Sequence, residues 1–276
     1  MEQNAHHNTE TTLETFTIKR IRDLADILGG IIEAFRLIAT GNPELYGIVS
    51  RSLFFSGTAV ILAILWGTPL AMLIALKEFR GKTVLKTFFS TLIGLPTVVL
   101  GLILLLILSK GGPLGFLGLL YTPGAIILGQ AILITPILVS IGVSAIESVD
   151  PEILNLSKTL GASESQAQIA VLKEALNGII LSDIASFNRA IGELGVVLLI
   201  GGNIAGGGNR TDVLTTAISR YTAIGEIDYA VALGILLMII VFAINIIVVL
   251  LRRANYLVEL AKTPYFKLKR YRENKA

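Results

Sequence analysis

Three charged side chains lie in an apolar segment near residue 190 and are the groups of this chain best placed for chemistry. They are Asp183, Arg189 and Glu193. Ser182, Ser186, Arg189 and Glu193 follow one another at spacings of four, three and four, so a helix would place them on one face. Arg189 and Glu193 can pair along that face. The pattern fits either an internal ion pair that fixes helix packing or the polar lining of a pore or gate.

Catalytic chemistry of the familiar kinds is excluded by what the chain lacks. It has no cysteine, and its two histidines, His6 and His7, lie in a polar tail ahead of every apolar run. An intramembrane metalloprotease or serine protease needs a histidine within an apolar segment, and this chain has none there. Asp183 is the only aspartate inside an apolar run, so an aspartyl pair is missing as well. There is no complete phosphate-binding loop of the Gly-x-x-x-x-Gly-Lys-Ser/Thr type. We expect no catalytic residues, no metal site and no cofactor held by this chain.

The composition indicates an integral membrane protein. Of 276 residues, 53% are hydrophobic and 16% are charged, against about 25% charged in soluble domains. A helix needs about 20 apolar residues to cross a bilayer. Four runs contain no charge: Ser52–Leu76, Thr87–Ser109, Gly111–Ile146 and Tyr229–Leu251. With the segment that carries Arg189, they predict an all-α membrane protein with about five transmembrane helices. The expected spans are 52–76, 87–109, 122–146, 176–200 and 229–251.

The distribution of positive charge predicts the orientation. The connections 77–86 and 147–175 and the tail after residue 251 together hold fourteen Lys and Arg residues, whereas the opposite connections hold three. Because Lys and Arg concentrate in cytoplasmic loops, we expect the C-terminus to be cytoplasmic. Five spans then place the N-terminus outside.

The segment ahead of the first span is amphipathic. Its apolar residues recur at helical spacing from Ile21 to Ile38, with charged residues on the other side. We expect this helix to lie along the membrane surface, a sixth short span being the alternative. The expected layout is a polar tail at 1–20, an interfacial helix at 21–45, a transmembrane domain at 46–251 with a hairpin at 150–175, and a basic cytoplasmic tail at 252–276.

A polar, helix-forming segment separates the third and fourth spans. Asp150 and Pro151 form a helix start, an N-cap acceptor followed by proline at the first helical position. Gly161 can end that helix, and Ser163 can cap the next one. The product is two short helices with a small-residue corner on the cytoplasmic side. This hairpin is either a docking element for a soluble partner or a loop packed on its own spans.

The corner carries a family resemblance. Its sequence Thr159-Leu160-Gly161-Ala162-Ser163 resembles the coupling-helix motif in the permease subunits of ABC importers. In that family the loop docks on the ATP-binding subunit and transmits nucleotide-driven closure to the membrane helices. The family pattern has Glu-Ala-Ala where this chain has Asn155-Leu156-Ser157, and a proline near Lys173. The coupling residues that the resemblance implies are Leu156, Thr159, Leu160, Gly161, Ala162 and Ser163.

Further motifs resemble one branch of that family. Gly192-Glu193-Leu194-Gly195 and the Gly201-Gly202-Asn203-Ile204 that follows are similar to the same span in molybdate- and tungstate-type permeases, and Asn42-Pro43-Glu44 points toward the tungstate type. The resemblance covers about Ile27 to Leu251. It implies a homodimeric permease subunit in the bacterial or archaeal plasma membrane that imports a tetrahedral oxyanion, with tungstate expected before molybdate or sulfate.

The partners also follow from the resemblance. They are an ATP-binding cassette ATPase, which would bind the ATP and magnesium, and an extracytoplasmic oxyanion-binding protein. Membrane lipid is expected around the spans, and no nucleic acid. The alternative function is an ion-coupled secondary transporter, in which Asp183 and Glu193 would have to carry protons.

Overall fold

The computed structural model describes residues 29–205 and 210–262, with side chains to residue 250. The predicted tail at 1–20, part of the interfacial helix and most of the basic tail lie outside the described residues. The described chain folds into helices joined by turns. They are a first helix over residues 29–39, α2 Pro43–Leu76, α3 Lys82–Leu92, α4 Thr97–Leu108, the 3₁₀ turn η1 Gly115–Leu117, α5 Pro123–Glu147, α6 Pro151–Thr159, α7 Glu164–Glu174, α8 Leu176–Ile191, α9 Gly195–Gly201, α10 Leu214–Ala223 and α11 Ile227–Lys262.

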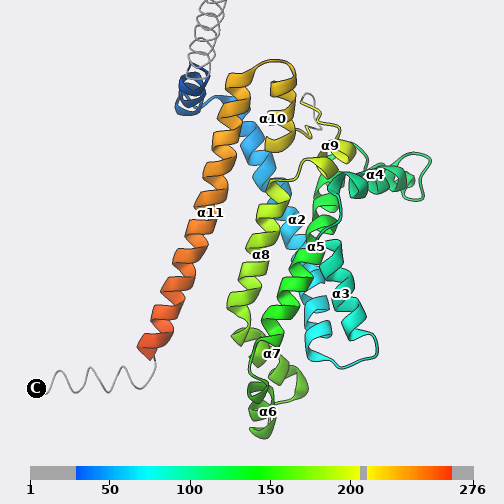
Figure 1. The fold of residues 1–276 in the computed structure, drawn as a ribbon, viewed down its shortest axis with the longest axis vertical. Helices are drawn as coiled ribbons and strands as arrows, with labels where there is room; N and C mark the ends of the chain where they lie inside the picture. Colours follow the sequence, from blue (N-terminus) through cyan, green and yellow to red (C-terminus); the bar gives the residue numbers. More distant parts are fainter. Residues whose placement is uncertain (1–28, 206–209, 263–276) are drawn as a thin grey trace, which may run out of the picture.

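A bundle of α2, α5 and α8 forms the centre of the molecule (Figure 1). Small residues let these helices approach closely, as is usual where helices pack within a membrane. A Cβ atom on Gly67 of α2 would lie 2.8 Å from the side chain of Leu138 on α5. A Cβ atom on Gly178 of α8 would lie 2.5 Å from Ala145, two turns farther along α5. The bundle therefore depends on glycines at the two helix contacts.

The last helix, α11, leaves the bundle as it descends (Figure 1). It has 36 residues and is about 54 Å long at 1.5 Å per residue. Its first turns pack against α10 and the helix over 29–39 through Ala230, Leu233 and Leu236. Farther along, Met238 and Phe242 are exposed. This apolar surface is suited to contact with lipid or with another membrane chain.

Two of the five predicted spans are bent. Among the described residues, three single helices are long and apolar enough to cross a membrane: α2, α5 and α11. The other two candidates are helix pairs, α3 with α4 bent by 100° and α8 with α9 bent by 56°. Five spans result when each pair is one span. The predicted spans at 87–109 and 176–200 are therefore each a bent pair of helices rather than one continuous helix.

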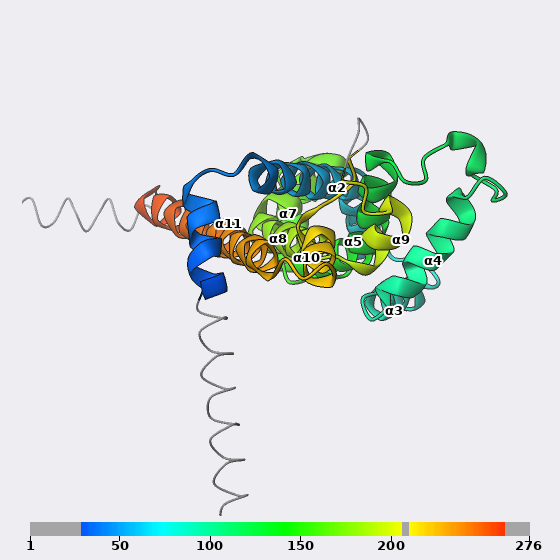
Figure 2. The ribbon, with the colours of Figure 1, turned by 90° about the horizontal axis from the view of Figure 1, so that it is seen from above.

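Local sequence explains the sharper bend. Proline has no N–H for helix bonding and disfavours helical geometry in the residue before it, and α4 begins directly after Pro96. As a result α4 projects sideways from the bundle, which is clear from above (Figure 2).

The first span also starts earlier than predicted. Asn42 caps α2 by accepting hydrogen bonds from the N–H groups of Glu44 and Leu45, and Pro43 occupies the first helical position. Residues 43–45 thus belong to α2 rather than to the amphipathic helix. The preceding helix over 29–39 lies across the upper end of α11 (Figure 2).

Candidate functional site

The hairpin of α6 and α7 hangs from the lower end of the bundle, between the last turn of α5 and the first turn of α8 (Figure 1). Asp150 begins it: its carboxylate accepts a hydrogen bond of 2.9 Å from the Glu152 N–H, and Pro151 is the first helical residue. The predicted helix start is confirmed. Because α6 follows α5 after only a few residues, a force on the hairpin acts directly on the central helix of the bundle.

A left-handed glycine forms the corner. Gly161 has φ +89°, a left-handed backbone conformation that L residues with a side chain rarely adopt. The N–H groups of Gly161 and Ala162 donate to the carbonyl oxygens of Lys158 and Ser157, each at 3.0 Å. This is the Schellman arrangement of a helix C-terminus. The predicted break at Gly161 is confirmed, and the motif fixes the angle at which the chain turns into α7.

Two further contacts hold the corner closed. Ser163 and Gln166 form a reciprocal capping box at the start of α7. Lys158 of α6 pairs with Glu164 of α7 at 2.7 Å. The hydrogen bond from Lys158 lowers the pKa of the Glu164 carboxyl below its ordinary value. The ion pair is therefore complete at neutral pH and is lost when the pH falls through that lowered pKa.

The hairpin has an inner and an outer surface. Val171 is buried in the cluster formed with the lower ends of α2 and α5, and Ala167 of the same helix is also buried. In contrast, Leu156 is 60% exposed, Leu160 78% and Ile169 49%. Of the other predicted coupling residues, Ala162 is half-buried, and Thr159, Gly161 and Ser163 are exposed. The corner thus presents large apolar side chains to the outside, which is typical of a protein contact surface.

The charged stripe of the fourth span is organised differently from the prediction. Ser182 and Ser186 are fully buried in α8, and Ser182 donates to the carbonyl oxygen of Ile179. The predicted pair of Arg189 and Glu193 forms at 2.5 Å. However, α8 ends at Ile191, so Glu193 lies in the bend beyond it. The four residues therefore do not lie on one continuous helix.

Glu193 acts as a joint between helices. It is 2% exposed, and its second carboxylate oxygen accepts the Val196 N–H at 3.0 Å, which caps the start of α9. The Thr215 hydroxyl of α10 donates to its carbonyl oxygen at 2.7 Å. One carboxylate thus ties Arg189 of α8 to α9. A gating role for Arg189 and Glu193 stays a prediction.

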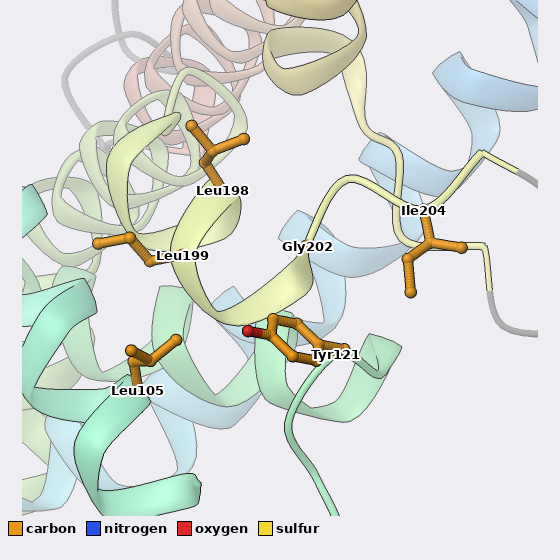
Figure 3. Close-up of a pocket in the computed structure, with 6 residues that line it drawn as sticks. All are labelled: Leu105, Tyr121, Leu198, Leu199, Gly202 and Ile204. Carbon is orange, nitrogen blue, oxygen red and sulfur yellow. The ribbon is translucent and has the colours of Figure 1, made fainter.

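A cavity of about 440 Å³ lies between α4, α9 and the chain that enters α5 (Figure 3). It is lined mostly by aliphatic side chains, with the aromatic ring of Tyr121 against Gly202. A Cβ atom on Gly202 would lie 2.8 Å from that ring. The apolar lining gives an anion few hydrogen bonds. The lining residues are Leu105, Tyr121, Leu198, Leu199, Gly202 and Ile204.

Sequence reasoning missed a buried ion pair at the upper end. Arg51 of α2 pairs with Asp212 at 2.7 Å and also donates to its carbonyl oxygen at 3.1 Å. Asp212 is fully buried. Beside it, the Ser52 hydroxyl accepts the Leu214 N–H at 2.7 Å. These bonds fix the chain before α10 to α2. The partners are 161 residues apart, and no local pattern could have paired them.

A known transport family matches most of this chain. The family described as "Binding-protein-dependent transport system inner membrane component" matches residues 67–255, which include the hairpin. The chain belongs to this family. The permease is 36% identical over 222 residues to the tungstate uptake system permease protein TupB of Peptoclostridium acidaminophilum, covering 80% of this chain and 96% of that one. It is 39% identical over 203 residues to a probable anion ABC transporter permease protein of Haloferax volcanii, covering 73% and 88%.

Solved structures agree on the fold of the permease. A chain of the MetNI methionine ABC transporter, in inward-facing conformations, superposes with a TM-score of 0.64 at 17% identity. The match covers 77% of the permease and 96% of that chain. The predicted fold, that of an ABC importer permease, is confirmed. The permease is a multi-pass inner-membrane protein and a transport subunit rather than an enzyme.

Proposed function

We propose that this permease carries a tetrahedral oxyanion across the membrane in an importer powered by a separate ATPase, with tungstate as the first expected cargo and molybdate or sulfate next. The observation that carries the proposal is its 36% identity to the tungstate permease TupB over nearly the whole of that protein. The family description supports a binding protein as the donor of cargo.

The exposed corner of the hairpin is the proposed contact with the ATPase. Leu156 and Leu160 offer apolar area, and the Schellman turn at Gly161 holds them in a fixed direction. An ATPase that moves this corner would move α5 and α8, because both are continuous with the hairpin. ATP and magnesium would be bound on the ATPase.

The proposed orientation places the hairpin and the C-terminus in the cytoplasm and the N-terminus outside. It is supported by the excess of Lys and Arg in those connections. It is also supported by the fold, since the hairpin and the lower end of α11 lie at the same end of the molecule (Figure 1).

A homodimer is the proposed assembly. The projecting helix α4 exposes apolar residues on a large part of its surface, with Val98 and Leu106 each 60% exposed. A second copy is a suitable partner for this exposed face, because the opposite face of α4 is already packed on α9 and α5 through Leu104 and Leu108. The ion-coupled alternative is disfavoured by membership of a family defined by binding-protein-dependent transport.

Uptake by a reconstituted complex tests the function. The permease, an ABC ATPase and an oxyanion-binding protein are placed in liposomes, and tungstate uptake is followed by elemental analysis. We expect uptake to require all three proteins. It should also require ATP on the side of the liposome membrane where the ATPase is bound to the hairpin. Uptake by the permease alone, driven by a proton gradient, would refute the proposal and favour a secondary transporter.

A further inference from the structure

A second, polar cavity lies in the cytoplasmic half of the membrane domain. It has a volume of about 440 Å³. The helix α3 runs beside α5 there (Figure 1). From α5, the Ser140 hydroxyl lies 3.0 Å from that of Ser90, and the Glu147 carboxylate lies 2.6 Å from the Lys86 ammonium. We call this cavity the α3 groove. Its lining residues are Thr83, Lys86, Thr87, Ser90 and Thr91.

The groove is one of three distinct faces of α3. Leu85 and Phe89 pack into the cluster formed with α2 and α5. Val84 and Phe88 form an apolar outer face, 73% and 53% exposed. The hydroxyl groups lie between these two faces. Because polar groups within a membrane are costly against hydrocarbon and usually face a protein or water-filled interior, this third face is suited to a hydrated path rather than to lipid.

The lysine of the groove is paired with a carboxylate of the neighbouring helix α5. A lysine that anchors a helix end extends its ammonium toward the headgroups. Lys86 instead contacts Glu147 of α5, and Lys82 is shared between Glu78 and Glu147 at 2.8 and 3.5 Å. The groove is thus close to neutral, with a cation whose counter-ion is built in.

We propose that the α3 groove is the inner half of the oxyanion path, with Lys86 as its cation and Glu147 as the counter-ion that the cargo displaces. The inference rests on the proposed function and adds the residues that the cargo meets. The hydroxyls of Thr83, Thr87 and Ser90 are donors for the oxygens of a tetrahedral anion. A water occupies about 30 Å³, so about 440 Å³ holds such an anion with part of its hydration shell.

The Glu147 carboxylate, already paired with Lys86, makes binding of the oxyanion weak, and weak binding is what conduction requires. A transport path must bind its ion well enough to admit it and weakly enough to release it. An anion at Lys86 replaces Glu147 instead of meeting a free charge. Glu147 is also the last residue of α5, three residues before the Asp150 that caps α6. Movement of the hairpin therefore acts on the partner of Lys86.

Single cysteines test whether the groove is hydrated and binds the anion. The chain has no cysteine of its own, so each variant carries one thiol. Thr87→Cys lies in the groove, and Val84→Cys is its control on the exposed apolar face of the same helix. The assembled, nucleotide-free complex is treated with an anionic methanethiosulfonate reagent, which reacts with thiolates and so requires water.

We expect Thr87→Cys to react much faster than Val84→Cys. Tungstate or molybdate should slow its reaction, while sodium chloride at the same ionic strength should not. Equal reaction rates of the two variants, or a Thr87→Cys rate that tungstate and molybdate leave unchanged, would overturn the proposal. The measurement needs no transport, so it decides on the groove even if the complex moves no oxyanion.

Uptake separates this inference from the proposed function. Lys86→Gln removes the cation and should lower ATP-dependent uptake by about tenfold or more, the usual effect of losing a hydrogen bond to a charged group. Lys86→Arg should retain most of the uptake. The matched control is Lys77→Gln, which removes one charge from the exposed loop before α3. All variants are first checked for unchanged thermal unfolding.

The outcomes are distinguishable. A wild-type complex without oxyanion uptake would refute the proposed function. A wild-type complex with uptake, matched by full uptake in Lys86→Gln, would refute the groove alone. If Lys86→Gln does not fold, Thr87→Val takes its place, because it removes a groove hydroxyl at nearly constant volume.

Discussion

Replacing Gly161 with alanine tests the corner of the hairpin as the point of contact with the ATPase. Gly161 has φ +89°, and an added Cβ would meet no heavy atom within 4 Å. The substitution therefore causes no clash. Its whole cost is that of placing an L residue in the left-handed region, about 1–2 kcal/mol.

The cost sets the size of the expected effect. The Gly161→Ala substitution destabilises the folded corner relative to other conformations of the hairpin. Where binding requires the folded corner, the apparent affinity falls with the population of that state. At about 1.4 kcal/mol per tenfold, the affinity for the ATPase should fall by up to about 30-fold. Gly161→Asn should have a smaller effect, because asparagine enters the left-handed region more readily.

The chain provides a matched control at the opposite end of the molecule. Gly225 follows α10 with φ +84° and likewise has no heavy atom within 4 Å of an added Cβ. Its N–H and that of Glu226 donate to Thr222 and Tyr221 in the same Schellman pattern. Gly225→Ala should therefore lose similar stability without any change in ATPase binding.

The assay is a titration of the detergent-solubilised permease with the fluorescently labelled ATPase subunit, combined with thermal unfolding of each variant. We expect similar unfolding temperatures for the two alanine variants and weaker ATPase binding only for Gly161→Ala. Equal ATPase affinity in both variants, at wild-type strength, would refute the argument that the corner is the docking element.

Three further predictions concern stability and are checked by unfolding in detergent. Asp212→Asn breaks the buried ion pair with the arginine of α2 and should lower the free energy of unfolding by about 3 kcal/mol. Glu33→Gln, in an exposed ion pair, should lower it by less than about 1 kcal/mol. Similar losses of stability in the two variants would contradict the role of burial. Glu193→Gln weakens both the pair and the cap at the bend and should cost about 1–3 kcal/mol, and wild-type stability would count against this joint. Gly129→Ala would place a Cβ 2.4 Å from a side chain of α9 and should cost about 1–3 kcal/mol; Gly57→Ala, with open space around it, should be neutral or gain up to about 1 kcal/mol.

The sequence by itself determined the hairpin and the number of apolar runs. The start at Asp150, the turn at Gly161 and the cap at Ser163 were all predicted and are all present. Such signals work because a cap or a C-terminal glycine satisfies backbone groups only a few residues away. The motif around Gly161 also pointed to the family that the comparison then identified.

The tertiary structure decided how these parts meet. The sequence contained the proline break, but the 100° angle between α3 and α4 depends on the helices packed around them. Glu193 looked like one member of a helical stripe and proved to cap the next helix. The pairing of Arg51 with Asp212, and of Lys86 with Glu147, joins residues 161 and 61 positions apart. Contacts of this kind are fixed by the mutual packing of whole helices, and a periodicity within one segment reports only which face is apolar, not which distant side chain lies opposite.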